Sequence, residues 1–198
     1  IAAGRIFAEQ LRHRLIEPLR AAIQRSVPII GICNGFQVLI KLGLLPDPES
    51  GRQQATLADN ASGRFVARWV ALDVPKETVC VWTKGLSSLQ LPIAHGEGRF
   101  VPASGERLEQ WRRAGQIAIR YGQGGNPNGS AGDVAGICDP SGVVFGLMPH
   151  PERYTHPTHH PSWTSGADVL GQVPGGLRII RNAVEHVRTG MAVDQVSG

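Results

Sequence analysis

Residues that together can activate a nucleophile occur in two short segments of this sequence. Cys33 stands between glycines in Gly31-Ile32-Cys33-Asn34-Gly35, and His150 and Glu152 follow much later in Pro149-His150-Pro151-Glu152. A cysteine thiolate attacks a carbonyl carbon, a histidine moves the proton, and a carboxylate orients the histidine ring. These residue types, in this order, predict nucleophilic catalysis by a Cys-His-Glu triad.

The segment around Cys33 matches the nucleophile elbow G-x-S-x-G, with cysteine in the position of serine. The apolar run at 27–32 is typical of a buried parallel strand, and 34–42 has a helical pattern. We expect the tight turn to lift the thiol above the sheet, and the helix dipole to lower the thiol pKa. The backbone N–H of Asn34 is then placed to stabilise an oxyanion. A buried structural cysteine in a glycine-rich turn is the alternative.

The other two cysteines are interpreted as small buried residues. Cys138 repeats the tripeptide Gly-Ile-Cys, but the turn at 139–142 follows it and cannot start a helix directly. Cys80 lies inside a short predicted strand. Three cysteines cannot all pair within one chain, so no disulfide framework is indicated, and a reducing, cytoplasmic location fits.

The spacing of His150 and Glu152 also carries information. Prolines on both sides of His150 favour extended backbone, in which residues i and i+2 point the same way. We therefore expect Glu152 to hold one ring nitrogen of His150 while the other nitrogen faces Cys33. A solvent-exposed loop histidine is the alternative.

The elements that must position these residues alternate along the chain. Helical patterns occupy 2–25, 34–42, 106–114 and 177–187, the last ending at Gly190. Strand patterns occupy 27–32, 64–74, 78–82, 92–95, 117–121 and a hairpin at 134–138 and 143–148, and long loops occupy 45–63 and 122–132. This order predicts one α/β domain over residues 1–198 with a partly parallel sheet.

Composition excludes several other classes of protein. The chain has 198 residues, 41% hydrophobic and 18% charged, which is too apolar for a disordered chain. No apolar stretch approaches the length of a membrane span, and the arginines behind the net charge of +4 are scattered rather than clustered. Nucleic-acid and membrane partners are therefore not expected. His156, His159 and His160 lack helical ligand spacing, so an ordinary loop is favoured there over a metal site.

The two catalytic segments resemble those of the class I glutamine amidotransferases. Further strings are similar to the glutaminase subunits of phosphoribosylformylglycinamidine synthase, namely IAAGRIFA (1–8), GICNGFQVL (31–39), PIAHGEGRF (92–100), NPNGS (126–130) and GLMPHPER (146–153). The string at 92–100 is the specific one, because it is not general to the amidotransferases. The resemblance implies a class I amidotransferase-like (flavodoxin-like) α/β fold, with a mixed, mostly parallel sheet flanked by helices.

The resemblance also implies residue roles. Cys33 would form a glutamyl thioester with L-glutamine, His150 would shuttle the proton, and Glu152 would orient His150. The implied substrate-binding residues are Asn34, Gly35, Gln37 and His95. A plain strand-end turn is the alternative interpretation of the segment at 95–98.

The implied partner is a synthetase subunit that uses the ammonia to convert formylglycinamide ribonucleotide to formylglycinamidine ribonucleotide, together with a small accessory subunit. ATP and magnesium are expected on the synthetase, because the sequence contains no G-x-x-x-x-G-K-[ST] phosphate loop, and no cofactor is expected on this chain. Two alternatives stay open. One is another hydrolase of this fold, a γ-glutamyl hydrolase or a peptidase, and the other is a catalytically inert interaction subunit.

The family fold begins before the position of Ile1, with a strand whose glycine-rich turn supplies a second oxyanion donor. We therefore expect this chain to be N-terminally incomplete, with a single oxyanion donor at Cys33. The strand at 27–32 should be central in the sheet. If a neighbour is absent, an open sheet edge, an apolar groove or another chain should lie beside it.

Overall fold

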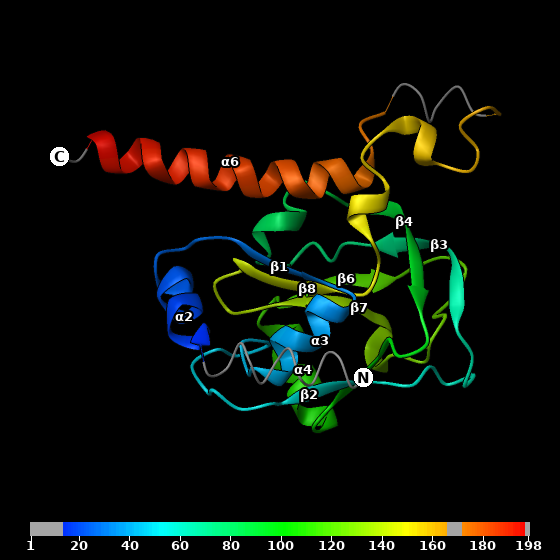
Figure 1. Cartoon of the computed structure of the whole chain (residues 1–198), viewed down its shortest axis with the longest axis horizontal. Coiled ribbons are helices and arrows are strands. Elements are labelled where there is room, and N and C mark those ends of the chain that lie inside the picture. Colours follow the sequence, from blue (N-terminus) through cyan, green and yellow to red (C-terminus); the bar gives the residue numbers. More distant parts are fainter. Residues whose placement is uncertain (1–13, 166–171, 197–198) are drawn as a thin grey trace.

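A computed structural model describes residues 14–165 and 172–196, which are built around a six-stranded sheet (Figure 1). In spatial order its strands are β1 (Ile29–Ile32), β8 (Val144–Leu147), β7 (Val134–Cys138), β6 (Ile117–Tyr121), β3 (Val66–Asp73) and β4 (Ser88–His95). A separate antiparallel pair consists of β2 (Ala55–Ala58) and β5 (Arg99–Pro102). The helices are α2 (Ile16–Gln24), α3 (Asn34–Lys41), α4 (Gly105–Arg113) and α6 (Gly175–Val196).

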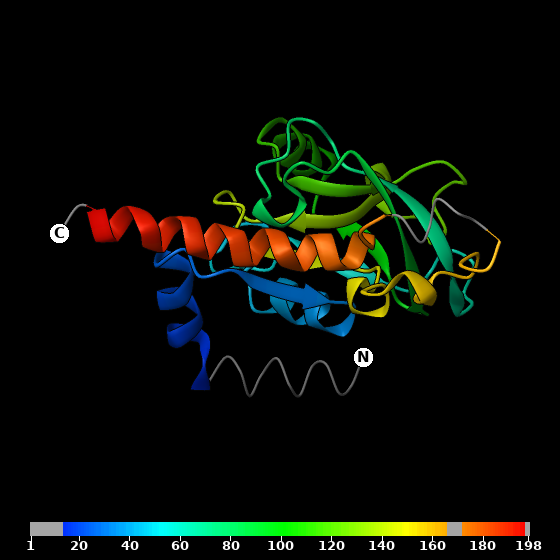
Figure 2. The same ribbon diagram turned by 90° about the horizontal axis from the view of Figure 1, so that it is seen from above.

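Helices cover both sides of the sheet, with α6 on one side and α3 on the other (Figure 1). Side chains of β8 divide between two hydrophobic clusters, Val144 in the cluster of α3 and Phe145 in the cluster of α6. Alternation of this kind follows from the pleat, which points successive side chains to opposite faces. The C-terminal part of α6 projects past the sheet in both views (Figure 2). No helix in the two described ranges has the length and apolarity needed to cross a membrane.

Strand directions confirm a mixed sheet flanked by helices, but they correct the expected share of parallel strand pairs. Within the described residues only β1 and β8 run parallel, with Ile32 opposite Leu147, and the other strand pairs of this sheet are antiparallel. The expectation of a mostly parallel sheet is therefore wrong for this part of the chain. The physical reason is the short connection between β7 and β8, because a tight turn can join only antiparallel strands.

The strand that leads to Cys33 lies at the edge of the described sheet. Among the residues of ranges 14–165 and 172–196, β1 pairs with β8 and with no second strand. Within the described residues β1 is therefore an edge strand and not the central strand that was expected. The outer row of β1 backbone groups consequently faces none of the described strands.

Three predicted elements need correction. The predicted loop at 45–63 contains β2, whose side chains alternate in burial against β5. The predicted strand at 78–82 instead runs irregularly into the 3₁₀ turn η1 (Val81–Thr83), because its backbone bonds go to separate loops, at Gly115 and Gly142. The last helix continues through Gly190, so this glycine does not end it.

The remaining predicted strands and helices are confirmed, with shifts at their ends. For the predicted helix at 2–25 the confirmation covers only α2, because residues 1–13 lie outside the described part. The proline in this segment, Pro18, stands in the first turn of α2, where a restart of the helix was expected.

Two paired glycines let α3 approach the sheet closely. Gly31 of β1 lies opposite Gly146 of β8. A Cβ atom at position 31 would lie 2.6 Å from both the Gly35 carbonyl oxygen and a methyl carbon of Leu39, and one at position 146 would overlap the ring of Phe36. Phe36 is fully buried as a result. The position of the helix that follows Cys33 therefore depends on glycine at these two positions of the sheet, because glycine has no side chain.

We expect Gly31→Ala to lower the free energy of unfolding by about 1–3 kcal/mol, because the new methyl group meets backbone that cannot move away. Urea denaturation followed by circular dichroism measures this change. Gly35→Ala is the matched control, because its Cβ meets nothing within 4 Å and the residue lies in α3. The control should be neutral or stabilising by up to about 1 kcal/mol. Equal effects of the two variants would contradict the close-approach interpretation.

Candidate active site

Cys33 joins β1 to α3 in a strained conformation. Its backbone angles are φ 52° and ψ −105°, in a region that residues with a side chain rarely occupy. Such a conformation costs about 1–3 kcal/mol and persists only where the surroundings enforce it. Here the Cys33 N–H donates to the Leu147 carbonyl at 2.9 Å, and its carbonyl accepts from the Gln37 N–H at 3.2 Å. The predicted nucleophile elbow is confirmed as a strand-turn-helix with the cysteine at its tip.

The electrostatics at the Cys33 thiol differ from expectation. Burial raises its pKa, and the negative charge of Glu152 adds to that effect. A hydrogen bond from the Asn34 backbone N–H and the positive charge of Arg153 lower the pKa, but they do not outweigh burial. The N-terminus of α3 thus lowers the pKa as expected, through the Asn34 N–H, but burial outweighs it and the net shift is upward. A thiol of this kind stays protonated at neutral pH and needs a base in order to attack.

His150 lies at the carboxyl end of the parallel strands β1 and β8, as Cys33 does. β1 and β8 are parallel neighbours, and His150 follows β8 just as Cys33 follows β1. The His150 backbone N–H donates to the Pro92 carbonyl at 2.8 Å, and the residue is only 7% exposed. The interpretation as a solvent-exposed loop histidine is thereby excluded.

Glu152 holds the His150 ring in one tautomer. Its Oε1 lies 2.7 Å from the Nδ1 of His150. An ionised carboxylate only accepts hydrogen bonds, so Nδ1 carries a hydrogen, and in a neutral ring Nε2 is then an acceptor. That Nε2 is buried and bonds to no atom of the described residues. The backbone was expected to be extended through Glu152, but Pro151–Arg153 form a 3₁₀ turn, because proline suits the first position of such a turn.

Arg153 is a site residue that the sequence patterns did not single out. Its Nε lies 3.5 Å from Glu152 Oε1, and its charge lowers the pKa of Cys33. Only its position directly after the His-x-Glu pair could have pointed to it. Arg153 and Glu152 thus act on the thiol with opposite signs.

Three residues predicted to contact substrate follow Cys33 on α3. Asn34 is exposed, and Gly35 is half-buried beside open space. Gln37 is buried, and its side-chain N–H donates to the Glu97 carbonyl at 3.0 Å. Gln37 therefore ties α3 to the loop at 95–98, and its contact with substrate stays a prediction, as do those of Asn34 and Gly35.

His95, the fourth predicted substrate contact, ends β4 and is 3% exposed. Its Nδ1 lies 3.0 Å from the side-chain oxygen of Asn60, and its Nε2 is buried with no partner among the described residues. Burial, and then the charge of His150, lower its pKa to about 4. The ring lies against Gly98, where a Cβ would overlap it. His95 is therefore neutral at pH 7 and close enough to His150 to feel its charge.

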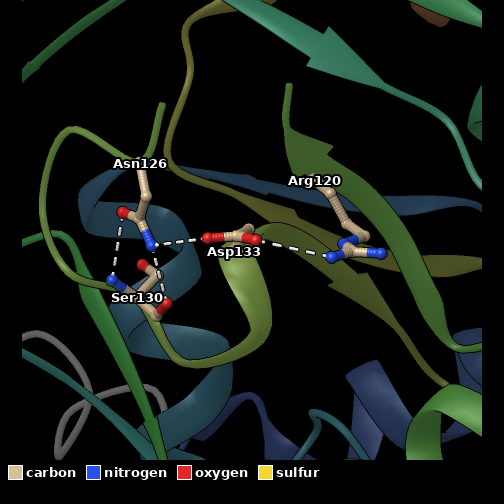
Figure 3. Close-up of polar contacts among 4 residues, drawn as sticks. All are labelled: Arg120, Asn126, Ser130 and Asp133. Carbon is tan, nitrogen blue, oxygen red and sulfur yellow. Dashed lines mark hydrogen bonds and ion pairs between the residues drawn. The ribbon is translucent and has the colours of Figure 1, made fainter. Parts of the chain in front are cut away.

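The NPNGS segment is held together by its own polar contacts (Figure 3), and it also bonds to the loop at 95–98. Asn126 donates to the Ser130 carbonyl at 2.7 Å and to Asp133 at 3.1 Å, and Asp133 pairs with Arg120. Within this frame Asn128 donates to the Gly98 carbonyl at 2.8 Å. The loop that carries His95 is thus fixed from the NPNGS side as well.

Asn128 also links the NPNGS segment to the neighbourhood of the nucleophile. Its side-chain N–H lies 3.2 Å from the Tyr121 hydroxyl. Burial raises the pKa of Tyr121, the hydrogen bond with Asn128 lowers it by less, and a thiolate at Cys33 would raise it further. The phenol therefore stays protonated, as a neutral group near the thiol.

The histidines of the loop after the triad have other partners. His156 Nδ1 lies 2.9 Å from the Thr158 hydroxyl, and His160 Nε2 lies 2.9 Å from the Gln90 side-chain oxygen. The His160 ring also packs edge-on against Trp69. Across 14–165 and 172–196, no three His, Cys, Asp or Glu side chains are grouped as metal ligands.

Cys80 and Cys138 are both almost fully buried. Their interpretation as structural residues is confirmed, and Cys33 is the most accessible of the three free cysteines.

Comparison with known proteins agrees with this geometry. The chain matches the family model of the CobB/CobQ-like glutamine amidotransferase domain over residues 1–187. It is 41% identical over 193 residues to phosphoribosylformylglycinamidine synthase subunit PurQ of Dehalococcoides mccartyi, covering 95% of this chain and 74% of that protein. PurQ of Methanococcus maripaludis is 36% identical, with 93% of this chain and 74% of the relative covered.

Among solved structures, PurLQS from Thermotoga maritima superposes with a TM-score of 0.66 at 31% sequence identity, covering 91% of this chain and 71% of that chain. The amidotransferase fold expected from the sequence is thereby confirmed. The chain belongs to the CobB/CobQ-like glutamine amidotransferases and, within them, to the family of phosphoribosylformylglycinamidine synthase PurQ subunits.

Proposed function

We propose that this chain hydrolyses L-glutamine through a thioester on Cys33 and supplies the ammonia to a synthetase partner. The partner uses ATP to convert formylglycinamide ribonucleotide to formylglycinamidine ribonucleotide in purine biosynthesis. The observation that carries the catalytic part is the pairing of a strained Cys33 turn with a buried, carboxylate-oriented His150 at one sheet edge. The PurQ relatives support the biosynthetic part.

The reaction follows from the protonation states of the site. His150 Nε2 takes the proton from the Cys33 thiol, and the thiolate attacks the side-chain amide carbon of glutamine. The Asn34 N–H donates to the oxyanion, and His150 returns the proton to the departing ammonia. Water, activated by His150, then attacks the thioester and releases glutamate. A second oxyanion donor, from a segment that would pair beside β1, stays a prediction.

The two alternatives predict different behaviour. A γ-glutamyl hydrolase or peptidase of this fold would share the elbow, but its sequence would lack the strings at 92–100 and 126–130, which form the bonded loop pair around His95. An inert interaction subunit would not need an oriented His150. The identity to PurQ over 95% of the chain favours the glutaminase over both.

The partners and the location follow as parts of the same proposal. The synthetase subunit would hold ATP and magnesium, a small accessory subunit would complete the complex, and this chain would bind no cofactor. We infer a cytoplasmic location from three free thiols. Residues 1–198 would act as one amidotransferase domain.

We expect Cys33→Ala to lower glutamine hydrolysis by at least about 10⁴-fold, because alanine fits the turn but offers no nucleophile. Glutamate release, measured in the presence of the synthetase partner, checks this. Cys138→Ala is the matched control. It removes an equally small thiol from a fully buried site, and it should leave turnover unchanged while costing about 1 kcal/mol of stability. Comparable hydrolysis by Cys33→Ala would rule out the mechanism.

Glu152→Gln and Arg153→Gln should move the Cys33 pKa in opposite directions. Removing the negative charge lowers the thiol pKa, and removing the positive charge raises it. The pH dependence of Cys33 alkylation by iodoacetamide should therefore shift to lower pH in the first variant and to higher pH in the second.

The Glu152→Gln variant also separates thiol ionisation from catalysis. Its turnover should fall by at least about 10²-fold although its thiol ionises more readily, because the His150 tautomer is no longer fixed. Glutamate release and the alkylation profile, measured on the same protein, check this split. Unchanged turnover would show that Glu152 does not orient His150.

A further inference from the structure

Asn60 is a buried side chain with every polar group engaged. It lies in the turn between β2 and β3 and is 3% exposed. Its side-chain NH₂ donates to the carbonyls of Arg64 and His95, each at 2.8 Å. Its side-chain oxygen accepts the Gly98 N–H at 3.2 Å and lies 3.0 Å from His95 Nδ1. One amide thus connects the start of β3 with both ends of the loop at 95–98.

These contacts fix the orientation of the Asn60 amide. Backbone carbonyls only accept hydrogen bonds, so the NH₂ group must face Arg64 and His95 carbonyls and the oxygen must face the ring. Because His95 Nδ1 faces the side-chain oxygen of Asn60, Nδ1 must be the donor of this hydrogen bond. His95 is therefore the Nδ1–H tautomer, and its Nε2 is a bare acceptor.

The bare Nε2 of His95 needs a donor that the described residues do not supply. It is buried and unpartnered in this part of the chain, and a buried unmet acceptor costs about 1–3 kcal/mol. His150 cannot supply the hydrogen, because Glu152 fixes it in the same tautomer, with a bare Nε2 of its own. Two acceptors near the nucleophile thus remain for different donors. In the proposed reaction His150 Nε2 takes the proton of Cys33, so the unpartnered Nε2 of His95 is left for a ligand.

We propose that Asn60 is a positioning residue that locks His95 as a hydrogen-bond acceptor for an N–H group of bound glutamine. This inference rests on the proposed glutaminase function. Glutamine offers two such donors, its side-chain amide and its α-ammonium group. A His95 ring with the opposite tautomer would present Nε2–H to both and repel them.

The arrangement also keeps His95 neutral during the reaction. Burial disfavours protonation of His95, and the positive charge that His150 carries after it gains the thiol proton acts in the same direction. The other ionisable side chains nearby in the chain are Arg64, next to the β3 end, and Glu97, on the loop itself. Neither of them bonds to the ring, whose described bond goes to Asn60.

Asn60→Asp tests the role of Asn60 through charge. The carboxylate still accepts from Nδ1–H, but its negative charge raises the pKa of His95 above the wild-type value of about 4. Below the raised pKa the ring is protonated on both nitrogens, and Nε2 donates instead of accepting. Glutamine affinity should therefore weaken by about three- to tenfold as the pH falls through the new pKa, and recover above it.

The matched control is Asn182→Asp. Asn182 on α6 also donates its amide to two carbonyls, those of Trp82 and Lys84, each at 2.9 Å, and it faces no histidine ring in the described contacts. ¹⁵N-edited NMR reports the tautomer and pKa of His95, with its signal assigned by loss in His95→Gln. Calorimetry in a Cys33→Ala background measures ligand affinity without turnover.

Wild-type protein should show Nδ1–H on His95, and only Asn60→Asp should raise its pKa. Two ligands identify the donor. L-Glutamate lacks the side-chain amide, and 4-carbamoylbutanoate lacks the α-amino group. The donor is the group whose removal abolishes the pH dependence of ligand affinity. An Nε2–H tautomer in the wild type overturns the proposal even if Asn60→Asp fails to fold, and so does an unchanged His95 pKa in a folded variant. Absence of glutamine binding with the expected tautomer would overturn the proposed function while supporting the positioning role.

Discussion

The close approach of α3 to the sheet is the constraint on which the site depends. Gly31 and Gly146 leave no side chain between the helix and the two strands, so the chain must turn sharply at Cys33 to enter α3. The turn holds Cys33 in the left-handed region, and the bond from Cys33 N–H to Leu147 fixes it against β8. Because β8 leads into His150, the same contact sets Cys33 and His150 at one end of the two parallel strands.

The loop at 95–98 is held by hydrogen bonds from neutral amide side chains rather than by charged groups. Asn60, Asn128 and Gln37 each bond to this loop, from three different segments of the chain. Neutral amides can be buried at lower cost than ions, and their donors and acceptors are directional. The loop can therefore hold a histidine in a defined tautomer without adding charge beside Cys33, whose pKa already responds to Glu152 and Arg153.

The sequence predicted the catalytic segments well because their signals are local. The Gly-x-Cys-x-Gly segment between a strand and a helix predicted the elbow, and two residues of spacing predicted the contact of His150 with Glu152. The raised pKa of Cys33 could not be predicted, because it depends on burial by distant segments. Asn60 was missed for a similar reason, since nothing in a surface-like Asn-Ala-Ser-Gly turn indicates that His95 lies against it. The strand β2 was likewise hidden in a polar segment whose partner, β5, is remote in sequence.

The protonated resting state of Cys33 has a consequence for oxidative chemistry. Peroxides and related oxidants attack thiolates and react far more slowly with thiols. Burial raises the pKa of the Cys33 thiol, which favours the thiol form over the thiolate. The most accessible of the three cysteines is therefore oxidised to sulfenic acid less readily than its exposure alone would suggest.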